Sequence, residues 1–504
     1  MAMRLNTAGR QPGGEGLIRS AGRRVRDGLW GTNRRRTVTA LTLVLLAVVS
    51  YFVLLKGSPT RLLQLSIFLA LFVVIITKPH IGIIALRVYR SLAAGLQLEH
   101  LFRGLGVTLT KSIGLFAVIG FIALVVTKKA KPVFGHKSQL IFIYGFLFAT
   151  LISAFQALAW KNVWTATFQL VENIVLYIIF VNLFAESKWF LRYTWFFVLS
   201  LFASCVTGIG SIFLSGVIRA AGAMGNPNGL AMVANFAAAM LLVLSLSVTD
   251  FKRRLLALCG LGTCLITIIF TGSRGGLLTI IITFTYQLIK RRKKLVPYLL
   301  AASLLVVALI LIPEQYKSRQ QQWFGALFAG ETEEALGGTR GFIYRSALDV
   351  FLKSPIIGVG PRTFGTIYQA EYAVEARGSA EHTKAVHSGI LEVLVSTGIL
   401  GFAFFLGLII ATYRLFRENE RLCRGAGLGE YLLLNGMYEA LFIATIVAGS
   451  FETILRGGQT FFVALAAAAA VNRAAVLFSA DAPSRVAAAP LAAPETANGA
   501  AAAR

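Results

Sequence analysis

The chain has 504 residues, of which 56% are hydrophobic and only 14% are charged, and its mean hydropathy is +0.72. Soluble domains carry about 25% charged residues, so this composition excludes a soluble globular protein. The net charge of +27 would suggest nucleic acid in a soluble protein. Here the basic residues cluster between hydrophobic runs, as the positive-inside rule expects of cytoplasmic loops, and we expect no nucleic-acid partner.

Apolar runs of 17 or more residues recur from Thr37 onward, and each is long enough to cross about 30 Å of hydrocarbon as a helix. Helices satisfy their own backbone hydrogen bonds in lipid, so the sequence predicts an all-α, polytopic integral membrane protein. Residues 80–98 contain Arg87 and Arg90, and are either a span, a re-entrant segment or an interfacial helix. The total is therefore about 12, and at most 14, transmembrane helices. Besides 80–98, the predicted spans are 37–55, 61–77, 108–126, 138–158, 163–184, 189–214, 225–248, 253–271, 275–290, 296–312, 387–413, 430–450 and 458–477.

The charge pattern orients these spans. Basic clusters at 290–294 and 414–424 are predicted to be cytoplasmic, which places the loop between them on the outer face together with the turns at 271–275 and 215–224. The polar N-terminus precedes an apolar run that we interpret as an anchor and not as a cleavable signal. The predicted regions are a basic cytoplasmic N-terminus (1–36), transmembrane helices (37–312), a large outer-face loop (313–386), transmembrane helices (387–478) and a disordered tail (479–504).

The large outer-face loop differs from the other connections in length and charge. Its charges balance, with eight acidic and eight basic residues, and it is long enough that function or disorder is expected of it. Helical periodicity over 339–353 and a second helical stretch around 366–376 indicate order. Ser354-Pro355 should end the first helix, and a tight turn should follow at 358–361.

His387 stands where this loop re-enters the membrane. A neutral imidazole there could take a proton from a hydroxyl group at neutral pH. The alternative is an interfacial histidine with a structural hydrogen bond. Carboxylates within membrane spans are functional candidates, or else partners of Arg or His. They are Glu172, Glu392, Glu439 and Glu452.

Two arginines are candidates for binding an anion on the outer face. Arg274 lies in a glycine-rich turn between two short spans, and Arg340 follows the glycine pair at 337–338. Guanidinium groups bind phosphate oxygens in pairs, and flanking glycines let backbone N–H groups approach an anion. The alternative for Arg274 is a snorkelling anchor, but such anchors favour the cytoplasmic side.

Asn226 and Asn228 open the span at 225–248, where each either caps the helix or contacts a substrate. The chain has four Asp residues and no Asp-x-Asp pair, so we expect no metal site, and a phosphate-binding loop and a nucleotide fingerprint are absent from the sequence. We expect no cofactor. A reaction on the outer face would then need a donor that is already activated in the membrane.

Four motifs together resemble the O-antigen ligase and polymerase superfamily of bacterial envelope glycan assembly. The departure from the family is Ser388, where the family most often has Asn. The motifs are Thr271-Gly272-Ser273-Arg274-Gly275-Gly276, Thr339-Arg340-Gly341-Phe342-Ile343-Tyr344-Arg345-Ser346-Ala347, Ser354-Pro355-Ile356-Ile357-Gly358-Val359-Gly360-Pro361-Arg362-Thr363-Phe364, and His387-Ser388-Gly389-Ile390-Leu391-Glu392-Val393-Leu394-Val395-Ser396-Thr397-Gly398-Ile399-Leu400-Gly401.

The resemblance implies a glycosyltransferase whose donor is undecaprenyl pyrophosphate carrying a glycan. In the ligase branch the acceptor is a sugar hydroxyl of lipid A–core, and the transfer is metal-independent. The resemblance further implies that His387 is the general base and that Arg274 and Arg340 bind the pyrophosphate. Arg345 and Arg219 are lesser candidates for substrate binding. The enzyme would be a multi-pass protein of the bacterial inner membrane, with its site facing the periplasm.

Three alternatives stay open at the level of sequence. An O-antigen polymerase would use the same donor with a second lipid-linked glycan as acceptor. A protein O-oligosaccharyltransferase of the same superfamily would use a protein acceptor. From a different class, a transporter of lipid-linked glycans would need no transfer chemistry, although the inverted repeats typical of transporters are not evident in the sequence.

Overall fold

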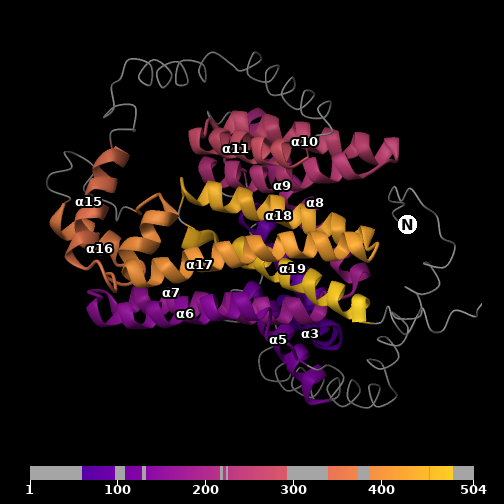
Figure 1. Cartoon of the computed structure of the whole chain (residues 1–504), viewed down its shortest axis with the longest axis horizontal. Coiled ribbons are helices and arrows are strands. Elements are labelled where there is room, and N and C mark those ends of the chain that lie inside the picture. The colour runs from indigo at the N-terminus through magenta and orange to yellow at the C-terminus, as the bar shows by residue number, and fades with distance from the viewer. Residues whose placement is uncertain are drawn as a thin grey trace, which may run out of the picture.

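The computed structural model describes residues 59–96, 108–127, 132–215, 219–222, 225–291, 339–372, 385–452 and 454–480. Over these ranges the chain folds into helices joined by short connections (Figure 1). The prediction of an all-α, polytopic membrane protein is confirmed, because nine helices in this part of the chain are long and apolar enough to cross a membrane. The predicted spans 37–55 and 296–312 lie outside the described residues, as do the N-terminal region and the tail from residue 481. The total of 12 to 14 therefore stays a prediction.

The helices of the first half follow the predicted spans closely. Residues 80–98 form a helix with ends near those predicted, and it is not one of the nine. The helices are α3 (Pro59–Thr77), α4 (Pro79–Leu96), α5 (Leu109–Val126), α6 (Lys137–Ser153), η2 (Ala154–Gln156), α7 (Trp160–Leu183), α8 (Ser187–Ser215), α9 (Pro227–Ser247), α10 (Phe251–Thr271) and α11 (Arg274–Lys290).

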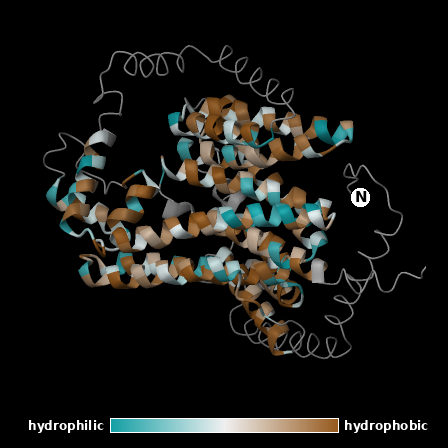
Figure 2. Cartoon of the chain, viewed as in Figure 1, coloured by the Kyte–Doolittle hydropathy of each residue, from teal (hydrophilic) through white to brown (hydrophobic). Residues whose placement is uncertain are grey.

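Three helices form the centre of the bundle: α9, α18 (Gly429–Gly449) and α19 (Ile454–Ala480). Between 72% and 83% of their apolar windows is buried inside the protein, against 33% to 50% for the other six. Small residues allow this close packing, as in the alanine runs 237–239 of α9 and 466–470 of α19. Hydrophobic residues dominate all the bundle helices (Figure 2), so the outer six present apolar side chains to their surroundings.

The described part of the large loop folds as two helices at one end of the bundle (Figure 1). The first is α15 (Thr339–Lys353), as predicted, and it ends before Ser354-Pro355. The second, α16 (Phe364–Glu371), is shorter than the predicted 366–376. Ile343, Ala347 and Val350 of α15 pack with apolar residues of α16 and with Val395 in a small separate core. A small hydrophobic core therefore holds the two loop helices in place.

Helix α17 (Gly389–Gly425) contains a break at Gly398, whose φ of 63° and ψ of −168° are not helical. Residues 355–360 of the loop dock into this break and replace the two helical hydrogen bonds that it removes. Each freed group therefore has a partner, as burial within a membrane protein requires. The bonds run from Val359 N to Val395 O (3.0 Å), Gly360 N to Ser396 O (2.9 Å), Ile399 N to Pro355 O (2.8 Å) and Leu400 N to Ile356 O (3.2 Å).

Only glycine fits the contact between the two segments. A Cβ built on Gly358 would lie 2.5 Å from the backbone nitrogen of Gly398, and a Cβ on Gly398 would overlap the carbonyl of Ile356. The predicted tight turn at 358–361 is thus present, and its glycines serve docking as well as turning. Beyond the break, α17 continues as a helix through the basic cluster at 414–424.

Candidate functional site

His387 lies at the junction between the helical loop and α17, two residues before that helix begins. Its backbone is left-handed, with φ of 54°, which among the described non-glycine residues only Arg362 shares. Such backbone costs about 1–3 kcal/mol and is typical of functional sites, where the surrounding structure enforces it. Here the Tyr344 hydroxyl donates to the carbonyl of His387 (3.3 Å), and Ser388 Oγ caps α17 by accepting from Leu391 N (3.4 Å).

A carboxylate from a distant part of the chain faces the imidazole of His387. The Nδ1 atom lies 3.5 Å from Oε2 of Glu452, a residue that follows α18. The side chain of His387 is 35% exposed and that of Glu452 is 19% exposed, so the imidazole can be reached while the carboxylate is mostly covered. The approach is electrostatic and not a hydrogen bond, because Nδ1 has no hydrogen-bond partner among the described residues. A negative carboxylate at this distance still favours a proton on Nδ1 over Nε2, which leaves Nε2 as the proton acceptor.

The turn between α10 and α11 presents Arg274 as the first residue of a helix. Gly272 ends α10 in a left-handed conformation with φ of 59°, and Ser273 Oγ caps α11 by accepting from Gly276 N (3.2 Å). The first turn of a helix has unpaired N–H groups and a partial positive charge. The guanidinium of Arg274 therefore belongs to a locally positive segment.

This positive turn packs directly beside the histidine–glutamate pair. A Cβ built on Gly275 would lie only 2.8 Å from the Cβ of Phe451, the residue before Glu452. Arg274 and His387 are thus linked through their neighbours. Gly275, next to Arg274, packs on Phe451, and Glu452, next to Phe451, faces the imidazole. The segments that contain Arg274, His387 and Glu452 therefore converge here, although the first lies more than a hundred residues from the other two in sequence.

Arg219 is fixed to the same turn. Its Nε donates to the carbonyl of Thr271 (2.8 Å), and the amide of Ala220 donates to the carbonyl of Phe270 (3.0 Å). Because Thr271 is the last residue of α10, these bonds hold residues 219–222 against the Arg274 turn. Arg219 is therefore beside the candidate site.

One of the two asparagines at the start of α9 caps the helix. Asn226 accepts from the amide of Asn228 through its side chain (2.9 Å), which is the helix-capping alternative. The residue that ties α9 to the Arg274 turn is Asn235, whose Nδ2 donates to the carbonyls of Ala231 (2.8 Å) and Gly276 (3.0 Å). A substrate contact of the first two asparagines stays a prediction.

Arg340 and Arg345 both lie on α15, but at different positions relative to His387. Tyr344, which contacts His387, follows Arg340 by four residues, and residues spaced by four share one face of a helix. Position 340 is therefore on the face of α15 that meets His387, one turn from the contact. Arg345 is exposed on the loop.

The far end of α15 carries an exposed ion pair. Lys353 Nζ lies 2.5 Å from Oε2 of Glu371, and this hydrogen bond raises the pKa of Lys353. The amine is therefore charged at neutral pH but already has an anionic partner. That makes it a control for the other cations of the loop.

The sequence suggested Glu452 as a partner of Arg or His, and the structure places it against His387. Sequence reasoning did not single out Tyr344, because a tyrosine on a loop helix carries no signal of which backbone carbonyl it will meet. Arg362 was named only within a motif. Its left-handed conformation depends on docking of residues 355–360, which no local pattern predicts.

These features define a class: a multi-pass α-helical membrane protein with a His–Glu pair and an arginine-bearing turn at one end of the bundle. Residues 257–406 match the family model described as O-Antigen ligase. The matched segment begins in α10, contains Arg274 and His387, and ends in α17. Glu452 and Arg219 lie outside the matched residues. Comparison with curated proteins gives no match for this chain.

Proposed function

We propose that the protein is an O-antigen ligase, a glycosyltransferase that moves O-antigen glycan from undecaprenyl pyrophosphate to a sugar hydroxyl of lipid A–core in lipopolysaccharide biosynthesis. The observation that carries this proposal is the contact of His387 with Glu452 beside the Arg274 turn, within a domain of the O-antigen ligase family. The proposed location is the bacterial inner membrane, with the site on the periplasmic face. The bundle's apolar surface makes membrane lipid a further partner.

In the proposed reaction His387 is the general base. Its Nε2 takes the proton of the acceptor hydroxyl while that oxygen attacks the anomeric carbon of the donor sugar. The new C–O bond forms as the bond from the anomeric carbon to the pyrophosphate oxygen breaks, so direct attack inverts the anomeric centre. Glu452, whose carboxylate lies 3.5 Å from Nδ1, stabilises the imidazolium that forms.

The leaving group is undecaprenyl pyrophosphate, on which negative charge develops. Arg274 and Arg340 are proposed to bind it, since cations aimed at developing charge stabilise a transition state. The first turn of α11 adds backbone N–H groups to the same end. Arg345, Arg219, Asn226 and Asn228 are proposed to contact donor or acceptor. We propose that no metal or cofactor takes part.

Transfer of glycan from purified lipid-linked donor to lipid A–core, with a chelator present, tests the proposal. We expect activity to persist in chelator, and to fall about 10²- to 10⁴-fold in His387→Ala and about 10²-fold or more in Arg274→Ala and Arg340→Ala. Chelator-sensitive transfer would overturn the metal-free mechanism.

Two matched controls accompany these variants. His136→Ala removes a histidine at the start of α6, about 25 Å along that helix from its other end, where Gln156 contacts Ser354 of the loop. Lys353→Ala removes a cation of α15 that Glu371 already binds. Both controls should retain transfer, and a loss equal to that of the site variants would mean that any substitution disrupts the fold.

The alternatives predict other outcomes. An O-antigen polymerase would extend a lipid-linked glycan, and cells without it would attach single repeat units to core. A protein O-oligosaccharyltransferase would glycosylate protein. A transporter would move no glycan between molecules, and its His387→Ala variant would function fully in cells.

A further inference from the structure

One side of α6 is apolar and exposed along its length. Its exposed side chains recur every three or four residues and therefore form one stripe on the helix, which η2 continues. A helix that is long and apolar enough to cross a membrane turns such a stripe toward lipid. The stripe consists of Ile141, Tyr144, Phe148, Leu151 and Phe155. It ends beside the loop, where the Ser354 hydroxyl donates to Gln156 Oε1.

The loop helix α15 carries a second exposed apolar stripe. Leu348 is 50% exposed and Leu352 is 64% exposed, and Ile356, in the turn that follows the helix, is 66% exposed. The charged residues beside this stripe, which are exposed and spaced by four, are Arg345, Asp349 and Lys353. The exposed side of α15 is therefore divided lengthwise into an apolar half and a charged half. This is the pattern of a helix that lies in the boundary between membrane and water.

The two stripes form one continuous surface. The bond between Ser354 and Gln156 brings the residues on either side of Ser354 to the end of the α6 stripe. On the other side, Ile399 N donates to Pro355 O (2.8 Å), and the side chain of Ile399 is exposed on α17. Single exposed apolar residues are ordinary on a protein surface, whereas a contiguous patch marks a contact.

The level of the lipid headgroups at this end of the bundle is marked by tryptophan. Trp160 and Trp164 lie in the first turns of α7, just after Gln156, and both are more than half exposed. Tryptophan concentrates at the interface between membrane and water. Helix α15 crosses the direction of α6 and α7 at this end of the bundle (Figure 1). A helix in this orientation lies along the membrane surface and not through it.

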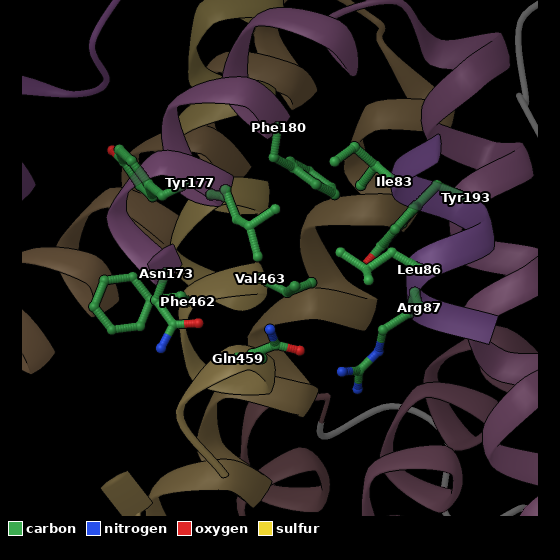
Figure 3. A pocket seen from close by; sticks show the side chains of 12 residues that line it. Ile83, Leu86, Arg87, Asn173, Tyr177, Phe180, Tyr193, Gln459, Phe462 and Val463 are labelled. Atoms are coloured by element: carbon green, nitrogen blue, oxygen red, sulfur yellow. The ribbon is translucent and has the colours of Figure 1, made fainter. Parts of the chain in front are cut away.

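Cavities inside the bundle are too small for lipid. One is lined by Arg87, Asn173 and Tyr193, among others, and has a volume of about 30 Å³ (Figure 3). A second, lined in part by Gln169 and Arg362, has a volume of about 40 Å³. Each has room for a few water molecules. Lipid contacts are therefore assigned to the outer surface of the described residues.

We propose that α15 is an interfacial helix, and that Leu348, Leu352 and Ile356 insert between the headgroups and acyl chains of the adjoining lipid leaflet. Continuity with the α6 stripe favours lipid over a protein partner, because a protein on this patch would meet a surface that already faces lipid. Tyr344 lies one turn before Leu348 and bonds to the carbonyl of His387, so insertion holds His387 near the level of the headgroups. That consequence rests on the proposed function, in which both substrates are anchored in lipid.

Nitroxide labelling of the full-length protein in liposomes of phosphatidylethanolamine and phosphatidylglycerol tests the proposal. Leu348→Cys, Asp349→Cys, Leu352→Cys and Lys353→Cys are each labelled in a Cys259→Ser background, because the other three native cysteines are buried. Relaxation of each label by molecular oxygen, which concentrates in hydrocarbon, is compared with relaxation by a water-soluble nickel chelate. We expect oxygen to be the stronger relaxant at 348 and 352, and the nickel chelate to be the stronger at 349 and 353.

Two reference positions calibrate the comparison. Phe168→Cys lies on the exposed side of α7 and reports lipid, and Arg424→Cys lies at the end of α17 far from the loop and reports water. Stronger relaxation by nickel at all four test positions would place α15 in water and overturn the proposal. Weak relaxation by both reagents at 348 and 352 would mean that protein covers the stripe, and would overturn lipid as its partner. The measurement uses neither donor nor acceptor, so it can fail while the proposed transferase activity stands.

Discussion

Replacing Gly398 by alanine should release the docked turn from α17. The new Cβ would overlap the backbone carbonyl of Ile356, and backbone cannot move aside as the end of a flexible side chain can. The left-handed conformation costs alanine about 1–3 kcal/mol. Separating the segments also gives up hydrogen bonds of about 1 kcal/mol each. Four such bonds join residues 355–360 to α17 and are worth about 4 kcal/mol together, and we expect the overlap and the left-handed cost to cancel about 3–4 kcal/mol of this docking energy.

A loss of that size raises the population of the undocked loop by about 10²- to 10³-fold. The assay is limited proteolysis of the purified full-length protein, in which cleavage within 339–372 reports the opened state. Gly341→Ala is the matched control, because position 341 is helical and a Cβ there meets no atom within 4 Å. It should slow cleavage slightly, as alanine favours helix. Wild-type resistance to cleavage in Gly398→Ala would refute the reasoning.

Three further predictions concern the supports of the site. Glu452→Gln should lower kcat about 10- to 100-fold with little change in KM, because a neutral amide stabilises the imidazolium of His387 less well; an unchanged kcat would remove Glu452 from the mechanism. Glu439→Gln should destabilise the protein by about 1–3 kcal/mol in thermal or denaturant unfolding, since it removes one of the two carboxylates that pair with the mostly buried ammonium of Lys290 and leaves Glu420 as the other; an unchanged melting temperature would contradict this. Asn235→Ala should cost about 1–3 kcal/mol by removing the buried hydrogen bond from its Nδ2 to Gly276, which joins α9 to α11, and a neutral melting temperature would contradict this.

The membrane fold is predictable because run length and charge are sequence properties. Apolar windows set the helices of the bundle, and Ser354-Pro355 sets the end of α15. The break in α17 is different. Residues 387–413 are mostly apolar, and a glycine at 398 does not distinguish a kink from close packing. The distinction depends on residues 355–360, which supply the replacement hydrogen bonds from forty residues away in sequence.

The candidate site likewise combines features that are local in sequence with contacts that are not. Arg274 and His387 are recognisable in sequence, because a glycine-rich turn and a histidine at a membrane boundary are local features. Their proximity is not local, since it passes through Phe451 and Glu452 after α18. Residue type named the candidate groups, and tertiary packing decided which of them meet.

The docking of residues 355–360 on α17 therefore positions two parts of the loop, its centre and its exit. At its centre, residues 355–360 bond to α17, and the chain then enters the left-handed Arg362, whose guanidinium donates to Gln169 of α7. At its exit, α15 packs on α17, and Tyr344 bonds to the other left-handed residue, His387. Releasing the turn should then relax both strained residues together. We accordingly expect Gly398→Ala to speed proteolysis within 339–372 and to lower glycan transfer in the same preparation. Faster cleavage with full retention of transfer would show that the docked turn and the transfer site are positioned independently.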